Sequence, residues 1–139
     1  MALKDFLLIL LPVISGTISS YLTYYLTMKS KRSDAIFHYK EEKYANLLVL
    51  LKGFVGKTSS GDLKRKFFDE QYKSWLYCSD DVVRAINNMV KLVIDSRGNT
   101  PDPGKGRAAV GEVVQTMRKD LLGKTKLSFN DFVYTDVID

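Results

Sequence analysis

Hydrophobic and polar positions divide the chain into two parts at about residue 28. Residues 6–28 contain no charged side chain; the run opens as FLLILLPVI and continues with Ser, Thr and Tyr among its apolar residues. A helix of this length is about 35 Å long, which is enough to cross the roughly 30 Å hydrocarbon core of a bilayer. The pattern therefore predicts a single N-terminal transmembrane helix.

Beyond residue 32, apolar side chains recur at spacings of three, four and seven residues, which is typical of one face of a helix. We expect four amphipathic helices: over residues 33–55, over residues 62–77, from an N-cap at Ser79 onward, and over residues 107–122. Ser33 and Asp34 are candidate caps for the first of them; the alternative is a helix that continues unbroken from the apolar run. Most connections between the four helices are short, which favours antiparallel neighbours. The predicted fold class is all-α, with the transmembrane helix followed by an antiparallel bundle of about four helices.

Each predicted helix has an apolar face that should point to the core of this bundle. These faces consist of Phe37, Tyr44, Leu47, Leu48, Leu51, Phe54 and Val55; then Leu63, Phe67, Phe68, Trp75 and Leu76; then Val82, Val83, Ile86, Met89, Val90 and Val93; and finally Ala109, Val110, Val113, Val114, Met117 and Leu121.

The predicted domains are an anchor with a basic juxtamembrane segment, residues 1–32, and a cytoplasmic helical bundle, residues 33–139. Within the bundle, residues 96–106 should form a loop and residues 124–139 a C-terminal tail. Gly123 is expected to end the last long helix in a left-handed conformation. Ser128, with Asp131 three residues later, predicts a capping box for one short final turn.

The apolar N-terminus has a second interpretation, a signal peptide cleaved after Ser15 or Ser20. We favour the anchor, because the uncharged run extends well past either cleavage point and Lys4 is offset by Asp5. Tyrosines are common where a transmembrane helix meets the headgroups. The membrane-interface residues are therefore predicted to be Tyr21, Tyr24, Tyr25, Lys29, Lys31 and Arg32.

The charge distribution predicts an orientation. The whole net charge of +5 falls in residues 29–79, because the stretches on either side are balanced. Lys and Arg mark the cytoplasmic side of a span, so we expect the N-terminus outside and the C-terminal domain in the cytoplasm. A single cysteine, Cys78, agrees with a reducing compartment. The expected partner of Lys29, Lys31 and Arg32 is an anionic lipid surface rather than a nucleic acid.

Small and hydroxylated side chains recur along one face of the predicted span, in line with Pro12. The candidate helix–helix contact residues are Gly16, Ser19, Ser20, Thr23 and Thr27. Such a stripe allows two membrane helices to approach closely, which would give a homo-oligomer. The alternative is a span whose hydroxyls bond back to their own helix.

No motif in the sequence predicts a cofactor, a metal or a catalytic centre. The tripeptide GKT occurs twice, at residues 56–58 and 123–125, but Leu51 and Arg118 stand where a phosphate-binding loop needs its first glycine. His38 with Glu41 and Glu42 has ligand-like helical spacing, yet the chain has no second histidine. We therefore expect no enzyme activity.

Two features are candidates for docking a partner protein. Trp75, close in sequence to Phe67, Phe68 and Tyr72, is expected in the core, with an exposed aromatic anchor as the alternative. The second candidate docking surface consists of Arg118, Lys119 and Lys124, because the segment MRKDLLGKTKLS is dense in charged side chains. Basic side chains near a helix C-terminus also suit the helix dipole.

The segments WLYCSDDVVRAINNMV (residues 75–90) and MRKDLLGKTKLSFNDF (residues 117–132) resemble a group of uncharacterised bacterial and archaeal proteins. Those proteins pair one N-terminal membrane segment with a small helical domain, so the resemblance implies architecture and no activity. The leading hypothesis is a single-pass membrane protein whose cytoplasmic bundle is an interaction or regulatory module. The alternatives are a basic nucleic-acid-binding domain and a secreted helical protein.

Overall fold

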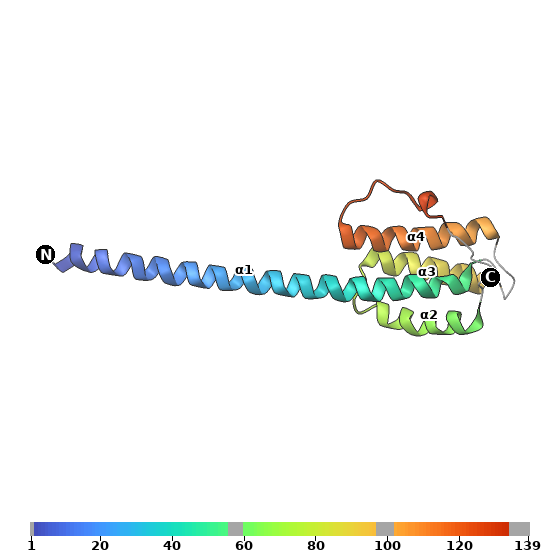
Figure 1. The fold of residues 1–139 in the computed structure, drawn as a ribbon, viewed down its shortest axis with the longest axis horizontal. Coiled ribbons are helices and arrows are strands. Elements are labelled where there is room, and N and C mark those ends of the chain that lie inside the picture. Colours follow the sequence, from blue (N-terminus) through green and yellow to red (C-terminus); the bar gives the residue numbers. More distant parts are fainter. Residues whose placement is uncertain (1, 56–59, 97–101, 134–139) are drawn as a thin grey trace. The chain divides into compact units, whose positions relative to one another are not determined.

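The computed structural model describes residues 2–55, 60–96 and 102–133, and all regular structure in those ranges is helical. The elements in chain order are α1 (Ala2–Leu50), the 3₁₀ helix η1 (Leu51–Phe54), α2 (Gly61–Ser74), α3 (Asp80–Asp95), α4 (Pro103–Leu122) and the 3₁₀ helix η3 (Phe129–Asp131). Figure 1 shows their arrangement. The predicted all-α class is confirmed for the described residues.

The chain forms two units, Met1–His38 and Tyr39–Asp139. Unit 1 is helical, and every side chain described in it, from Leu3 to His38, is exposed. Unit 2 comprises the last turns of α1 together with all later elements. Of the two alternatives that the sequence left open, a cap at residues 33–34 or a helix that continues from the apolar run, the structure has the second, because residues 29–38 contain neither Gly nor Pro and α1 is unbroken there.

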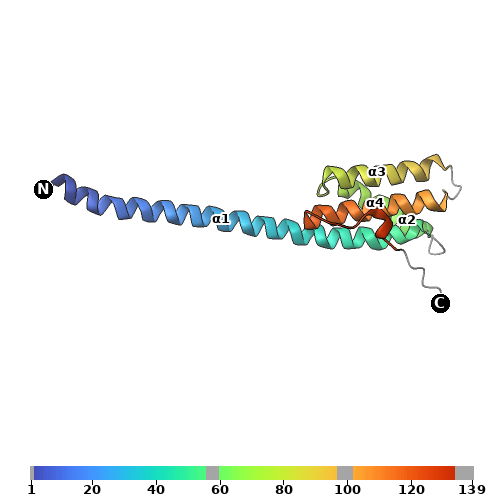
Figure 2. The same ribbon diagram turned by 90° about the horizontal axis from the view of Figure 1, so that it is seen from above.

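Unit 2 packs around one hydrophobic core. Figures 1 and 2, taken from two directions, both show α2, α3, α4 and the last turns of α1 side by side. The buried core residues are Tyr44, Leu47, Leu50, Leu51, Val55, Phe67, Val82, Ala85, Ile86, Met89, Val110, Val113 and Met117. Most belong to the predicted faces, so the helical spacing of the sequence identified the core of unit 2.

Two positions on the predicted face of the first helix are wrong. Leu48 is exposed because it lies about 100° around the helix from the fully buried Leu47. Phe37 is also exposed; it belongs to unit 1, where its ring contacts that of His38 edge-on at 5.8 Å between centroids. Leu50, which was not predicted to face inward, is buried instead.

Helix α4 begins four residues earlier than predicted. Asp102 Oδ1 accepts a hydrogen bond from the backbone N–H of Gly104 at 3.0 Å, and Pro103 occupies the first turn. Proline suits that position because its fixed φ is helical and the first turn needs no N–H donor. The segment DPGKG, which we expected to lie in the loop, therefore caps and starts the helix.

The C-terminal end of α4 matches the prediction more closely. Gly123 has φ 75°, a conformation that favours glycine, and its N–H donates to the carbonyl of Lys119 at 2.8 Å. Farther along, the Asp131 carboxylate accepts from the backbone N–H of Ser128 at 2.6 Å and from its hydroxyl at 3.0 Å. These hydrogen bonds lower the pKa of Asp131 and complete the predicted capping box.

Gly53 marks a close approach between η1 and α2. A Cβ atom at this position would lie 2.7 Å from Cβ of Leu63 and 3.1 Å from the backbone nitrogen of Lys64. We expect Gly53→Ala to lower the free energy of unfolding by about 2 kcal/mol, because neither neighbour can move without shifting α2. Urea unfolding followed by the fluorescence of Trp75, the single tryptophan of the chain, measures the change.

The matched control for this substitution is Gly61→Ala at the start of α2. A Cβ atom there meets nothing within 4 Å. Because alanine is the better helix former, we expect a gain of up to about 1 kcal/mol. An unchanged stability in Gly53→Ala would show that the contact between η1 and α2 is looser than the structure has it.

Candidate functional site

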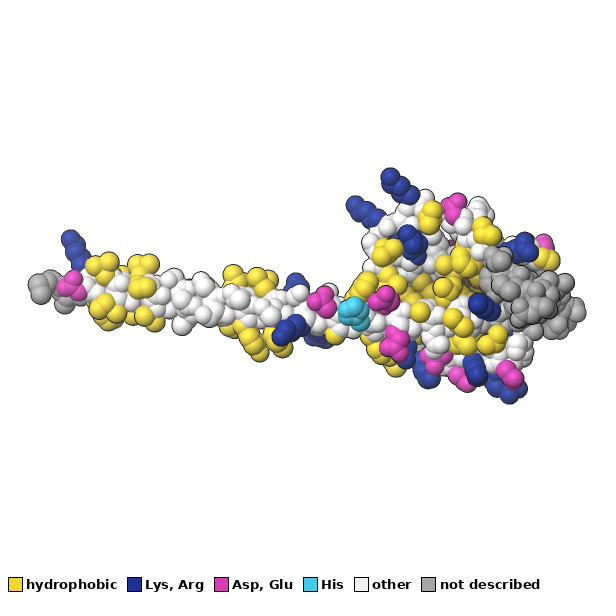
Figure 3. All heavy atoms as spheres, in the orientation of Figure 1, with side chains coloured by type: hydrophobic (Ala, Val, Ile, Leu, Met, Phe, Trp, Pro, Cys, Tyr) yellow, Lys and Arg dark blue, Asp and Glu magenta, His cyan; other side chains and the backbone are white. Residues whose placement is uncertain are grey.

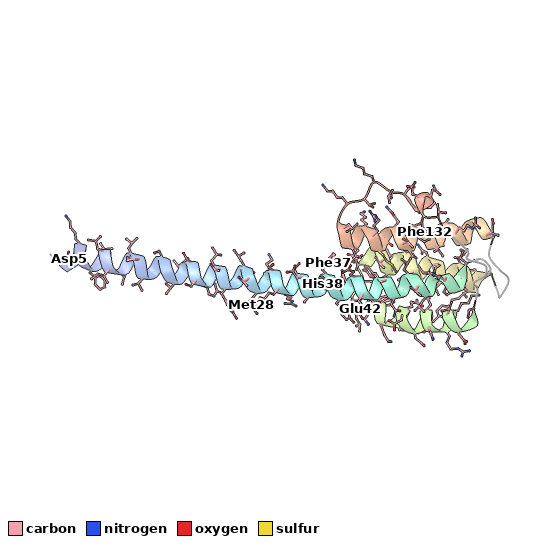
Figure 4. The ribbon with its side chains drawn as sticks, viewed as in Figure 1. Asp5, Met28, Phe37, His38, Glu42 and Phe132 are labelled. Carbon is pink, nitrogen blue, oxygen red and sulfur yellow. The ribbon has the colours of Figure 1, made fainter. Side chains whose placement is uncertain are left out.

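The helix of unit 1 carries apolar side chains that are exposed throughout its described length. Within the described residues, one helix is long and apolar enough to cross a bilayer; its most apolar 18-residue window has a mean hydropathy of 1.8, and none of that window is buried. Figure 3 shows the hydrophobic side chains along this helix, and Figure 4 labels Asp5 and Met28, which lie at the two ends of its uncharged stretch. Signal sequences and core helices of soluble proteins have similar length and composition.

The predicted membrane-interface residues all lie on this exposed helix. Tyr21, Tyr24 and Tyr25 are between half and three-quarters exposed, and Lys29, Lys31 and Arg32 follow within two turns. Tyr21, Tyr25 and Arg32 are four and seven residues apart, so they share one side of the helix. Their role at a membrane interface stays a prediction.

The small-residue stripe is exposed as well. A Cβ atom on Gly16 would meet nothing within 4 Å. Two neighbouring hydroxyls bond back to their own helix: Ser15 Oγ donates to the carbonyl of Pro12 at 3.0 Å, and Thr17 Oγ1 donates to that of Val13 at 2.9 Å. The predicted contact residues Ser19, Ser20, Thr23 and Thr27 remain candidates for helix association.

A polar cluster, which the sequence did not predict, lies within unit 2. One carboxylate oxygen of Asp120, Oδ2, pairs with Lys40 Nζ at 2.9 Å and accepts from Tyr44 Oη at 2.5 Å. The side chains of Lys40 and Asp120 are 22% and 15% exposed, so most of the pair is shielded from water. The ion pair joins the first turn of unit 2 to the last turn of α4, eighty residues away in sequence.

The sequence held a signal for this cluster. Lys40 lies four and seven residues before the buried Tyr44 and Leu47, and Asp120 lies three and seven residues after the buried Met117 and Val113. Both charges therefore fall on a buried helical face, where an ionised side chain needs a partner. An acid on one buried face and a base on another are therefore expected to form an ion pair with each other.

Two further groups extend the cluster. The Tyr77 ring contacts those of Tyr39 and Tyr44, with centroids 5.6 and 6.2 Å apart. Its hydroxyl is buried and has no hydrogen-bond partner among the described residues. Burial raises the pKa of Tyr44, of Tyr77 and of the neighbouring Cys78 thiol. The thiol therefore stays protonated at neutral pH, as expected of a structural cysteine rather than a nucleophile.

We expect Asp120→Ala to lower the free energy of unfolding by about 3 kcal/mol. The substitution removes the partner of a largely buried ammonium group and the acceptor of a buried tyrosine hydroxyl. Asp120→Asn, which keeps an acceptor oxygen, should lose less. Glu112→Ala is the control because Glu112 is an exposed acid on the same helix. Equal urea midpoints for Asp120→Ala and Glu112→Ala would mean that the cluster contributes nothing to stability.

Trp75 is not in the core, contrary to the prediction. Its side chain is 62% exposed, and it lies between the exposed Tyr72 and Leu76, at 78% and 89%. The reason is that α2 ends at Ser74, which is only 1% exposed and whose hydroxyl donates to the carbonyl of Gln71 at 2.6 Å. Ser74 takes the inward position of the last turn, and the chain then leaves the helix. The alternative, an exposed aromatic anchor, fits this geometry.

The predicted basic docking residues lie at and beyond the end of α4. Arg118, Lys119 and Lys124 are exposed, and Arg118 Nε donates to Thr125 Oγ1 at 3.2 Å. Lys119, Lys124 and Lys126 line an open hollow of about 780 Å³ between α4 and the segment that follows it. We name residues 118–126 the basic segment; it carries four Lys or Arg side chains and one acid, Asp120.

The remaining chemical motifs gain no support from their surroundings. The first GKT lies outside the described residues, and the second continues into the nonhelical residues 124–128. Across residues 2–55, 60–96 and 102–133, no three His, Cys, Asp or Glu side chains are placed to hold a metal ion. Two pairs of neighbouring acids occur in the sequence, Asp69 with Glu70 and Asp80 with Asp81. One member of each forms an ordinary surface ion pair: Glu70 with Lys73 at 2.7 Å, and Asp81 with Arg84 at 3.3 Å.

Four features bear on the function: the unit 1 helix, the polar cluster, the basic segment, and residues 75–79 between α2 and α3, which we name the Trp75 turn. None of them is a constellation of reactive groups. We compared the chain with protein-family models, with curated proteins and with solved structures, and none of these matched.

Proposed function

We propose that this chain is a single-pass membrane protein whose N-terminal helix anchors an antiparallel helical bundle that acts as an interaction or regulatory module. One observation carries the proposal: the apolar helix of unit 1 leaves its whole hydrophobic window exposed, while unit 2 has a core of its own. Exposed apolar surface on this scale is unfavourable in water. In a bilayer, these apolar side chains contact lipid chains instead of water.

The proposed orientation places the N-terminus outside and the bundle in the cytoplasm. Its basis is the excess of positive charge at Lys29, Lys31 and Arg32 over Lys4 at the other end of the uncharged run. The single cysteine suits that compartment.

The role of the bundle is proposed to be binding rather than catalysis. Trp75 and Leu76 are large apolar side chains exposed next to one another on a turn, and aromatic side chains in such positions are frequent anchors of protein interfaces. The buried polar cluster of Lys40, Tyr44 and Asp120 fixes the adjoining elements, so the turn is presented on an ordered support.

Membrane fractionation with alkaline carbonate extraction tests the anchor. We expect the full-length protein to stay in the carbonate-resistant pellet with an intact mass of 15.8 kDa. Recovery in the soluble fraction at full mass would contradict the anchor. A product cleaved after Ser15 or Ser20 and released outside the cell would instead establish the secreted alternative.

Protease accessibility tests the orientation. In inverted membrane vesicles, added protease should digest the bundle, and in intact cells the bundle should be protected. The reverse result would leave the anchor in place and overturn the proposed direction.

A further inference from the structure

Three separate parts of unit 2 converge where the chain enters it. Tyr39, the first residue of the unit, packs its ring against Tyr77 in the turn between α2 and α3, with centroids 5.6 Å apart. Lys40, the next residue, pairs with Asp120 in the last turn of α4 at 2.9 Å. The Trp75 turn and the basic segment therefore belong to the same end of the unit, which we name the entry end.

The exposed surface of the entry end combines two kinds of side chain. Trp75 and Leu76 are exposed apolar groups on one turn. The basic segment supplies exposed positive charges, and its one acid, Asp120, is neutralised by Lys40. Near the turn, the carboxylates of Glu70 and Asp81 are paired with basic side chains. The other acids of this end are Asp69 and Asp80 beside the turn, and Glu41 and Glu42, which follow Lys40 in α1.

This combination has the chemistry of a membrane-binding surface. Tryptophan partitions into the headgroup region because its ring is apolar while its indole N–H remains hydrated. Clustered Lys and Arg side chains are attracted to anionic lipids, each contributing roughly a five-fold preference near the surface. A protein partner would use the same aromatic side chains, but the basic segment specifically complements an anionic surface.

Chain connectivity keeps the entry end close to such a surface. Only seven residues lead from Arg32, the last of the basic cluster that follows the apolar run, to Tyr39. Seven residues reach at most about 25 Å in any conformation. If Arg32 lies among the headgroups, the entry end is therefore within reach of the same leaflet.

We propose that the entry end docks on the membrane that holds the anchor, with Trp75 and Leu76 entering the headgroup region and Lys119 and Lys124 binding anionic headgroups. The inference rests on the proposed membrane anchor. Docking would make the exposure of the Trp75 turn depend on the content of anionic lipid, so that the interaction module is covered or released according to the membrane around it.

The fluorescence of Trp75 tests this proposal, because it is the only tryptophan in the chain. Full-length protein is reconstituted into vesicles of phosphatidylcholine alone or of phosphatidylcholine with phosphatidylserine, and a brominated phosphatidylcholine is included as quencher. With phosphatidylserine we expect emission shifted to the blue and quenched by bromine. Both effects should disappear at about 1 M NaCl, where charge interactions are screened beyond about 3 Å.

Charge-neutralising variants show whether the basic segment drives the effect. Lys119→Gln/Lys124→Gln should weaken docking by about thirty-fold. The control Lys91→Gln/Lys105→Gln removes the same charge from exposed positions; Lys105 borders Leu92 of α3 at the start of α4, away from the entry end. The control should dock as the unmodified protein does.

The outcomes separate this inference from the anchor on which it rests. Flotation of the same vesicles reports the anchor, and protein that fails to float contradicts both proposals. Protein that floats in every vesicle while its tryptophan emission and quenching are the same with and without phosphatidylserine overturns docking alone. Equal loss of quenching in the two double variants would also overturn it.

Discussion

The double variant Ile14→Arg/Ile18→Arg is expected to leave the membrane fraction. Both side chains lie near the middle of the uncharged run and are exposed, at 47% and 61%. A charged residue at the centre of a span costs about 3 kcal/mol on insertion scales, so two of them cost about 6 kcal/mol. That is about four orders of magnitude in the insertion equilibrium, enough to abolish anchoring by one marginally apolar helix.

The control for this variant is Ile36→Arg/Ile94→Arg, which adds the same charges at exposed positions outside the run. It should remain in the carbonate-resistant pellet with the unmodified protein. If Ile14→Arg/Ile18→Arg also remains there, the N-terminal helix is not what holds the protein to the membrane. If both double variants become soluble, the effect belongs to added charge in general and the anchor loses its support.

The sequence was sufficient to predict the helices and most of the core because both depend on local periodicity. Tyr44, Leu47 and Leu51 repeat at three and four residues, and no other regular structure buries such a set on one face. One of the missed positions, Trp75, lies at a helix end. Ser74 ends α2 and thereby exposes Trp75, and no periodic pattern indicates where a helix stops.

The polar cluster illustrates a second limit. The sequence shows that Lys40 and Asp120 lie on buried helical faces. It does not show that they contact each other, because this depends on how α1 packs against α4. Pairing across eighty residues is set by tertiary structure, which a single sequence does not reveal by spacing. The same applies to the entry end, whose apolar turn and basic segment are separated by more than forty residues in the chain.

The buried tyrosines have a consequence at high pH, and it is the second large effect that we expect. Burial raises the pKa of Tyr44, with the hydrogen bond to Asp120 as a further cause, and burial likewise raises the pKa of Tyr77. In the unfolded chain a tyrosine loses its proton near pH 10, whereas in the folded protein both hydroxyls keep theirs. The unfolded state then binds fewer protons than the folded state, so stability falls as the pH rises.

Above about pH 10, each of the two groups should therefore lower the free energy of unfolding by about 1.4 kcal/mol per pH unit, or about 3 kcal/mol per unit together. The raised pKa of the Cys78 thiol acts in the same direction and begins near its ordinary value of about 9. Below pH 8 none of these groups titrates in either state, and stability should be unaffected by them. Urea unfolding at a series of pH values measures the slope.

Tyr77→Phe isolates one of these contributions. It removes a buried hydroxyl that has no hydrogen-bond partner in the described part of the chain, so it should leave stability at neutral pH unchanged or raise it by about 1 kcal/mol. Above pH 10 its stability should fall about 1.4 kcal/mol per pH unit less steeply than that of the unmodified protein. Tyr72→Phe, at a ring that is 78% exposed, is the matched control and should keep the original slope. If stability falls with pH equally steeply in Tyr77→Phe and the unmodified protein, the Tyr77 hydroxyl ionises as readily in the folded protein as in the unfolded chain. That result would contradict the burial of this hydroxyl.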